Sequence, residues 1–224
     1  MEPELPRPGL HGSALLGLLA QLALIDSPTP TPAPVQGLGR WLGWEDAIAL
    51  SAALQTPEPP GLGSPVRAAK LAQQLQRDLQ RLRTELAGAM QQDGSQPGDT
   101  DSAPYRRHYA ARQQAMADAV GALRARARAA LALTTPQMQR LAALDAVLDP
   151  ALARREQALL ALLPTLLERH FNRLRPARDA APGADWLNTF RHDMRRMALA
   201  ELDLRLLPLQ GLLDTLAPQA HTDS

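Results

Sequence analysis

Histidine, the residue most often used for acid–base and metal chemistry, is scattered along this chain. The histidines are His11, His108, His170, His192 and His221. None lies four residues from another, so the sequence lacks the His-Glu-x-x-His spacing with which one helix face binds zinc, and the nearby Glu168 and Asp193 do not complete it. Cysteine is absent, which excludes thiolate chemistry and disulfides. The sequence therefore predicts no metal site.

Two pairs of neighbouring carboxylates have the spacing for a general acid and a general base. They are Asp145 with Asp149, and Glu201 with Asp203. The first pair lies one helical turn apart on a predicted amphipathic helix, where Arg140 and Arg154 are available as ion-pair partners. Ion pairs on a helix surface explain this spacing better than catalysis does.

Motifs for nucleotide binding and nucleophilic catalysis are missing too. No glycine-rich phosphate loop follows a strand, and Gly37, Gly39 and Gly43 fit a linker and a helix start. No serine has the spacing of a nucleophile elbow. We therefore predict no catalytic residue, no cofactor and no enzymatic activity. The alternative is a hydrolase or nuclease, which metal-dependent turnover lost on one His or Asp substitution would establish.

One predicted helix concentrates arginine, with only Asp118 as a counter-charge inside the helix and with Tyr105, His108 and Tyr109 nearby. Arginine contacts phosphates and, with tyrosine, stacks on unpaired bases, so this patch is a candidate site for nucleic acid or an acidic partner. The alternative is that carboxylates of neighbouring helices or of another subunit pair with these arginines, because no recognised nucleic-acid-binding motif accompanies them. The patch consists of Arg106, Arg107, Arg112, Arg124, Arg126 and Arg128.

The elements that must position these residues follow from the apolar composition of the chain. Leucine and alanine dominate, and the β-branched aliphatic residues are only Ile25, Ile48, Val35, Val66, Val120 and Val147. Leucine and alanine favour helices, whereas strands draw on valine, isoleucine and aromatic residues. The sequence predicts an all-α fold, an elongated antiparallel helical bundle of about six to seven helices with proline-rich linkers.

Prolines divide the chain into segments, because proline fixes φ and lacks the N–H that a helix interior needs. An extended linker is expected at 28–34 and a loop at 92–103. Pro164 should kink its helix, and Pro208 should bend or end the last one. The expected helices are 13–25, 38–55, 65–91, 104–133, 136–148, 150–174 and 185–216.

The predicted organisation is a single structural domain with distinct parts. Residues 1–64 hold N-terminal helices and proline-rich linkers, residues 65–217 the main helical bundle, and residues 218–224 a flexible tail. The apolar run at 13–25 is about half the length of a membrane span and follows Glu2 and Glu4 rather than a basic segment. It predicts a buried core helix, no membrane insertion and a cytoplasmic protein.

Aromatic residues and one leucine stripe mark candidate contact positions. Trp41, Trp44, Tyr105 and Tyr109 are candidate interface anchors. In segment 65–91 the leucines recur at spacings of four and three, which is typical of a coiled coil. This register would pair Asp78 with Arg83 across a parallel homodimer. A partner helix within the same bundle is favoured, because the pattern spans only about three heptads.

Four segments together resemble a known family. They are Trp41 to Leu54 (WLGWEDAIALSAAL), Pro104 to Leu123 beginning PYRRHYAARQQAM, Leu141 to Phe171, and Trp186 to Leu216. These helical patterns resemble the proteobacterial domain-of-unknown-function family DUF3348, which is associated with type III Zorya anti-phage defence gene sets. The resemblance implies partners from the same operon, namely a stator-like proton-channel membrane protein, an OmpA-like peptidoglycan-binding protein and a second small accessory protein. It implies no catalytic residues.

Two hypotheses of different classes follow. The first is a cytoplasmic, non-enzymatic adaptor or effector subunit that binds proteins of such a defence system through helical faces. The second is a nucleic-acid-binding module that uses the arginine patch on DNA or RNA. The formal net charge of +1 gives no overall field toward nucleic acid or anionic lipid, so the second depends on the local patch alone.

Overall fold

The computed structural model describes residues 14–25, 44–55, 65–91, 101–175 and 185–216. In these residues there are seven helices and no strand, which confirms the predicted all-α fold. The helices are α1 (Ala14–Gln21), α3 (Trp44–Gln55), α4 (Pro65–Gln91), α5 (Ala103–Leu131), α6 (Pro136–Leu160), α7 (Leu163–Leu174) and α8 (Trp186–Leu216). The predicted linker at 28–34, Trp41, most of the predicted loop at 92–103 and the tail at 218–224 lie outside the described residues.

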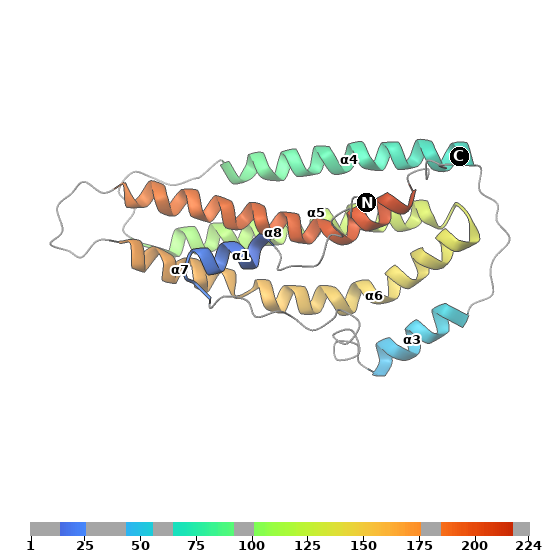
Figure 1. Ribbon diagram of the computed structural model, residues 1–224, viewed down its shortest axis with the longest axis horizontal. Helices are drawn as coiled ribbons and strands as arrows, with labels where there is room; N and C mark the ends of the chain where they lie inside the picture. The colour runs from blue at the N-terminus through green and yellow to red at the C-terminus, as the bar shows by residue number, and fades with distance from the viewer. Residues whose placement is uncertain (1–13, 26–43, 56–64, 92–100, 176–184, 217–224) are drawn as a thin grey trace, which may run out of the picture.

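The long helices lie side by side in an elongated bundle (Figure 1). Helices α4, α5 and α6 run in alternating directions, α7 continues in the direction of α6, and α8 runs back. A helix of 27 residues such as α4 is about 40 Å long, so lengthwise packing buries its apolar stripe best. Helix α5 packs against α4, α6, α7 and α8, and α8 packs against α1, α4, α5 and α7. Helices α5 and α8 are therefore the centre of the bundle, while α3 packs against α6 at its side.

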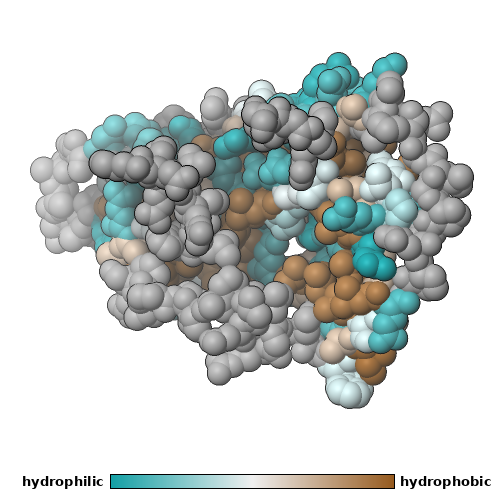
Figure 2. All heavy atoms as spheres, turned by 45° about the vertical axis from the view of Figure 1, so that its right-hand side comes forward, coloured by the Kyte–Doolittle hydropathy of each residue, from teal (hydrophilic) through white to brown (hydrophobic). Residues whose placement is uncertain are grey.

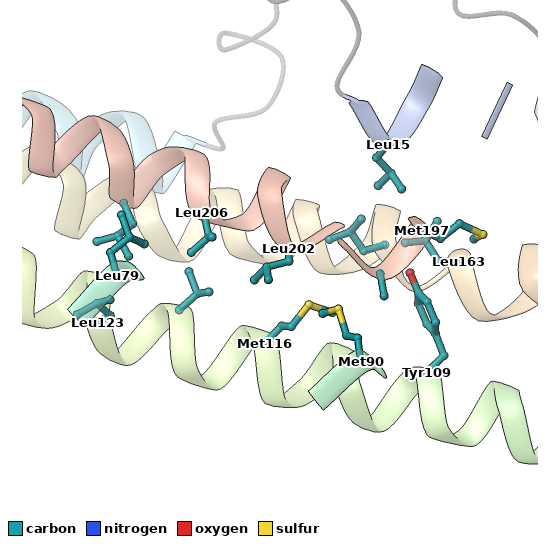
Figure 3. Close-up of a cluster of buried hydrophobic side chains, with 14 of the residues drawn as sticks. Leu15, Leu79, Met90, Tyr109, Met116, Leu123, Leu163, Met197, Leu202 and Leu206 are labelled. Carbon is teal, nitrogen blue, oxygen red and sulfur yellow. The ribbon is translucent and has the colours of Figure 1, made fainter. Parts of the chain in front are cut away.

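The core is built from leucine, alanine and methionine at helical spacing. On α8 the buried residues recur every three or four positions, as in Met194, Met197, Ala198 and Leu202. Figure 3 shows labelled side chains from α1, α4, α5, α7 and α8 converging on this core, among them Leu15. No helix in the described part of the chain has the length and apolarity needed to cross a membrane.

Two proline predictions were wrong. A separate helix was expected after Asp149, yet α6 runs through Pro150 to Leu160, because the packing of α6 on its neighbours outweighs the local cost of one proline without an N–H. A kink was expected at Pro164, but α6 ends and α7 begins at Leu163, which places Pro164 in the first turn. There the missing N–H has no intrahelical partner to lose. Helix α8 continues past Pro208 to Leu216.

Helix α1 ends in a Schellman motif that carries an unusual residue. The N–H of Leu24 donates to Leu19 O and the N–H of Ala23 donates to Ala20 O, both at 2.9 Å. Ala23 adopts a left-handed φ of 51°, where glycine is the usual residue. Arg173 of α7 donates hydrogen bonds to the carbonyl oxygens of Leu22 and Ala23, so this strained turn is held against the bundle.

We expect Ala23→Gly to stabilise α1, because glycine adopts a positive φ without the steric cost of about 1 kcal/mol that alanine bears. Amide hydrogen exchange of α1, followed by mass spectrometry, should slow by about fivefold. The control is Ala20→Gly in the same helix, which should speed the exchange because glycine is a poor helix former. Unchanged or faster exchange in Ala23→Gly would contradict the strain at this turn.

Candidate functional site

Two arginines of the predicted patch form a four-residue ion cluster between α5 and α6. Arg124 Nη2 lies 2.5 Å from Asp145 Oδ1, and Arg124 Nη1 lies 2.6 Å from Asp149 Oδ1. Arg128 Nη1 lies 3.0 Å from Asp145 Oδ2 and 2.5 Å from Asp149 Oδ2. Each carboxylate thus has a cation on both sides, and the cluster holds the two helices together. Arg124 is only 8% exposed.

The predicted partners of these aspartates were therefore wrong. Arg140 and Arg154 of the same helix were expected. Ion pairs within one helix form on its exposed side, whereas carboxylates that face an adjacent helix can pair with the cations of that helix. Here α5 faces this side of α6 and supplies Arg124 and Arg128 instead. Arg154 turns away to α3, with its Nη2 3.6 Å from Asp46 Oδ1.

Two further arginines of the patch also meet carboxylates of other helices. Arg106 Nη1 lies 2.8 Å from Glu168 Oε2 on α7, and Arg126 Nη2 lies 2.5 Å from Asp78 Oδ2 on α4. Asp78 thus pairs within the bundle, and Arg83 likewise meets Asp203 of α8 at 2.7 Å. The leucine stripe of 65–91 packs on helices of the same chain, as favoured above.

Arg107 and Arg112 complete the patch, and no carboxylate is recorded within 4.0 Å of either in the described residues. Arg112 Nε lies 3.5 Å from His108 Nε2 of the preceding turn. The side chains available to phosphate are thus fewer than the sequence predicted, because four of the six arginines already face carboxylates. Binding of nucleic acid or an acidic partner by this patch stays a prediction.

The predicted aromatic anchors divide between core and surface. Tyr105 is buried against Phe171 and Phe190, with ring centroids 5.8 and 5.1 Å apart. Tyr109 is buried as well, so both tyrosines anchor helices of the bundle to one another. Trp44, in contrast, is 81% exposed on α3.

A fully buried carboxylate, Glu201 of α8, stands at the centre of a polar network. Tyr109 Oη donates to Glu201 Oε2 at 2.9 Å, and Gln113 Nε2 donates to both carboxylate oxygens at 3.2 and 3.0 Å. Arg205 donates to Glu201 Oε1 from Nε at 2.9 Å and from Nη2 at 2.8 Å. Burial, together with the negative charge of Glu201, raises the pKa of Tyr109 well above its usual value, so this phenol remains a donor.

The network continues into α6. Arg205 Nη1 lies 2.8 Å from Glu156 Oε1, and Gln113 Nε2 donates to the carbonyl oxygen of Leu160 at 2.9 Å. Burial raises the pKa of Glu156, against the opposite effect of Arg205. Polar groups of α5, α6 and α8 therefore meet at one point in the bundle. A signal for this network was present in the sequence, since Glu201 and Arg205 occupy positions one turn apart in the mostly apolar stripe of α8.

Beside this network lies a groove of about 380 Å³ between α5 and α6. Both walls carry small residues, among them Ala117 and Gly121 on α5 and Ala153 on α6, which keeps the helices from filling the space with side chains. Arg205 of α8 lines it as well. The other polar residues that line it are Gln113, Gln114, Asp118, Arg124, Asp149, Glu156 and Gln157.

A second buried polar contact joins α7 to α8, and Arg173 extends it to the turn that follows α1. His170 Nε2 lies 2.8 Å from Asp193 Oδ2, and Arg173 Nη2 lies 2.9 Å from His170 Nδ1. Because a guanidinium can only donate, Nδ1 accepts and the ring proton lies on Nε2, toward Asp193. The described residues contain no group of three or more His, Asp or Glu side chains placed to hold a metal ion.

Helix α3 has apolar residues on both of its sides. Its least exposed positions, Asp46, Leu50 and Ala53, recur at spacings of four and three and mark the side that packs on α6. Trp44 and Ile48 lie one turn apart on the opposite side, and Ile48 is 53% exposed. Apolar residues on two opposite sides of a helix are typical of one that packs between two surfaces, and in the described part of the chain α3 packs mainly on α6.

Residues 1–218 match the protein family described as "Protein of unknown function (DUF3348)". No curated protein and no solved structure matches the chain.

We expect Glu201→Ala to destabilise the protein by about 3–5 kcal/mol, because Arg205, Tyr109 and Gln113 would lose their common partner inside the bundle. Urea unfolding measured by circular dichroism gives this value. Asp203→Ala, two residues along the same helix, is the control. It removes an exposed ion pair with Arg83 and should change stability by no more than about 1 kcal/mol. Equal effects of the two substitutions would contradict the central role of Glu201.

The nucleic-acid hypothesis requires Arg107→Glu with Arg112→Glu as its test. Substitution of Arg124 and Arg128 would break the ion cluster between α5 and α6 and report on folding instead. If the patch binds nucleic acid, retention on single-stranded DNA falls steeply with salt and is lost in the double variant. If the double variant is retained as strongly as the unaltered chain, or if the unaltered chain is not retained at low salt, the hypothesis is excluded.

Proposed function

The chain belongs to the DUF3348 family, and from that premise we propose that it is a non-enzymatic adaptor or effector subunit that acts through protein–protein contacts. The system we propose for it is an anti-phage defence set of the type III Zorya kind, with a proton-driven membrane motor complex as the element it acts with. The support for the system is the family resemblance of the helical segments. The support for the mode of action is the outer side of α3.

The observation that carries the proposal is the exposed apolar side of α3. Figure 2 shows the part of the molecule where α3 projects, at the lower right, with brown residues among white and teal ones and a larger brown area directly above. Trp44, Ile48 and Leu54 are all more than half exposed. Tryptophan is enriched among the residues that dominate the binding energy of protein interfaces, because its large rigid side chain buries much area with little loss of entropy. Trp44 and Ile48 lie one helical turn apart, and exposed apolar neighbours of this kind mark an interaction surface.

The ion pair between α3 and α6 lies on the packed side of α3, away from this surface. Arg154 of α6 meets Asp46 there, with 71% of the arginine side chain exposed. The outer side of α3 is therefore left with its apolar residues Trp44 and Ile48. The arginines of α5, by comparison, are mostly engaged by carboxylates of the bundle.

We expect Trp44→Ser with Ile48→Ser to abolish co-purification with the proteins of the operon. The bait is the full chain, co-expressed with the stator-like membrane protein, the OmpA-like protein and the small accessory protein. The affinity for the bound partner should fall by at least about tenfold, because an exposed tryptophan that anchors an interface contributes about 2 kcal/mol or more. Melting temperature should not fall, since both side chains project from the outer side of α3.

The matched control is Leu133→Ser, which removes a leucine that is 65% exposed on the turn between α5 and α6. It should bind as the unaltered chain does. A chain that binds none of these proteins would overturn the adaptor proposal. Binding that survives the α3 substitutions would remove α3 as the docking surface.

A further inference from the structure

The groove between α5 and α6 contains more negative charge than the cations around it neutralise. At one end Arg124 and Arg128 together balance Asp145 and Asp149. In the middle, Arg205 is already engaged by Glu201, which accepts from both its Nε and its Nη2. Glu156 is then the second carboxylate on one guanidinium, and within the described residues no other cation is recorded within 4.0 Å of it.

The geometry of Glu156 directs this surplus charge into the groove. Its Oε1 accepts from Arg205 Nη1 at 2.8 Å. No hydrogen bond from the described residues to its Oε2 is recorded, and this atom is not among the buried side-chain atoms that lack a partner. Oε2 therefore has solvent-accessible surface, on a side chain that lines the groove.

A second carboxylate lines the opposite wall. Asp118 of α5 accepts from the side-chain amide of Gln114 at 2.8 Å, and no cation is recorded beside it among the described residues. A neutral donor leaves its full negative charge in place. Glu156 on α6 and Asp118 on α5 thus give the groove two carboxylates that no arginine of the described chain neutralises.

Partial burial disfavours the charged form of Glu156 in this groove. Burial raises the pKa of Glu156, even though Arg205 and Arg124 act in the opposite direction. A charged group removed from water is stabilised when a counter-charge reaches it. A cation that entered the groove would supply that counter-charge, and the small side chains of Ala117, Gly121 and Ala153 leave room for an alkyl stem.

We propose that this groove binds the cationic end group of an alkyl guanidinium or alkyl ammonium ligand, with Glu156 as its ion-pair partner. A volume of about 380 Å³ is within the usual range for small-ligand sites. Guanidinium suits the site best, because its planar set of donors reaches a carboxylate and neighbouring amide oxygens together. Gln113 and Gln157 line the groove on either wall. This site is separate from the surface of α3 and does not depend on the function proposed above.

The test uses the full chain and isothermal titration calorimetry at low ionic strength. The probes are N-acetyl-arginine methylamide and its neutral isostere N-acetyl-citrulline methylamide, which differ in charge but not in shape. We expect the arginine probe to bind at least about tenfold more tightly than the citrulline probe, because only the former can pair with Glu156. Equal binding of the two probes, or binding of neither, would overturn the proposal.

Two variants and one control test whether the arginine probe binds in the groove beside Glu156. Glu156→Gln keeps the shape and an acceptor for Arg205 while it removes the charge, so it should weaken the arginine probe by at least about tenfold. Ala153→Met fills the groove without changing any charge and should also weaken it. Glu85→Gln, on the exposed side of α4, is the charge-matched control and should bind normally. Undiminished binding in both groove variants, with native melting curves, would overturn the assignment.

Two further probes separate the sources of the cation. A capped pentapeptide with a central arginine represents a protein side chain, and agmatine represents a free small amine. Tighter binding of the peptide than of agmatine would support a side chain of a protein partner, and the reverse would support a small metabolite. Either order supports the cation site, whereas failure of both probes would overturn it.

Discussion

The hydrogen-bonded carboxylate of Glu201 fixes how the helices of this bundle meet. It is inaccessible to solvent, and it accepts from Tyr109 and Gln113 of α5 and from Arg205 of its own helix. A buried ion is tolerated only when its hydrogen-bonding partners are correctly placed. The free-energy cost of leaving a buried polar or charged group without its partner is much larger than the cost of shifting an apolar side chain. Leucine stripes alone would allow α5 and α8 to slide by a turn. We infer that Glu201 selects one register.

The same polar contacts shape the side of the bundle that faces α6. Where apolar residues meet, as around Phe171 and Phe190, the helices pack closely and bury aromatic rings edge to face, with ring centroids 5.0 Å apart. Between α5 and α6, ion pairs and small residues take the place of large apolar ones, so a groove remains between the two helices. Helices α5 and α6 are thus joined by the ion cluster on one side of this groove and by the hydrogen bond from Gln113 to the Leu160 carbonyl on the other.

The distribution of charge separates the two candidate surfaces. The arginines of α5 that sequence alone directs to an outside partner are mostly paired inside the molecule, with carboxylates of α4, α6 and α7. Two other surfaces stand out in the described residues, an apolar one on the outer side of α3 and the groove between α5 and α6, which Asp118 and Glu156 line. Each surface suits a different class of partner, and they can be tested one at a time.

The sequence by itself determined the helical class and most helix positions, because the preference of leucine and alanine for helices and the period of an apolar stripe are local properties. It predicted the start of α6, where Thr135 accepts from the N–H of Met138, and the extent of α4. It failed at Pro150 and Pro164, since a proline disfavours a helix interior locally, whereas the packing of the helices decides where each helix ends. Only the tertiary structure decided the partners of Arg124, Glu201 and Asp149. An ion pair between helices depends on which helix faces meet, and the local sequence pattern around each residue does not show this.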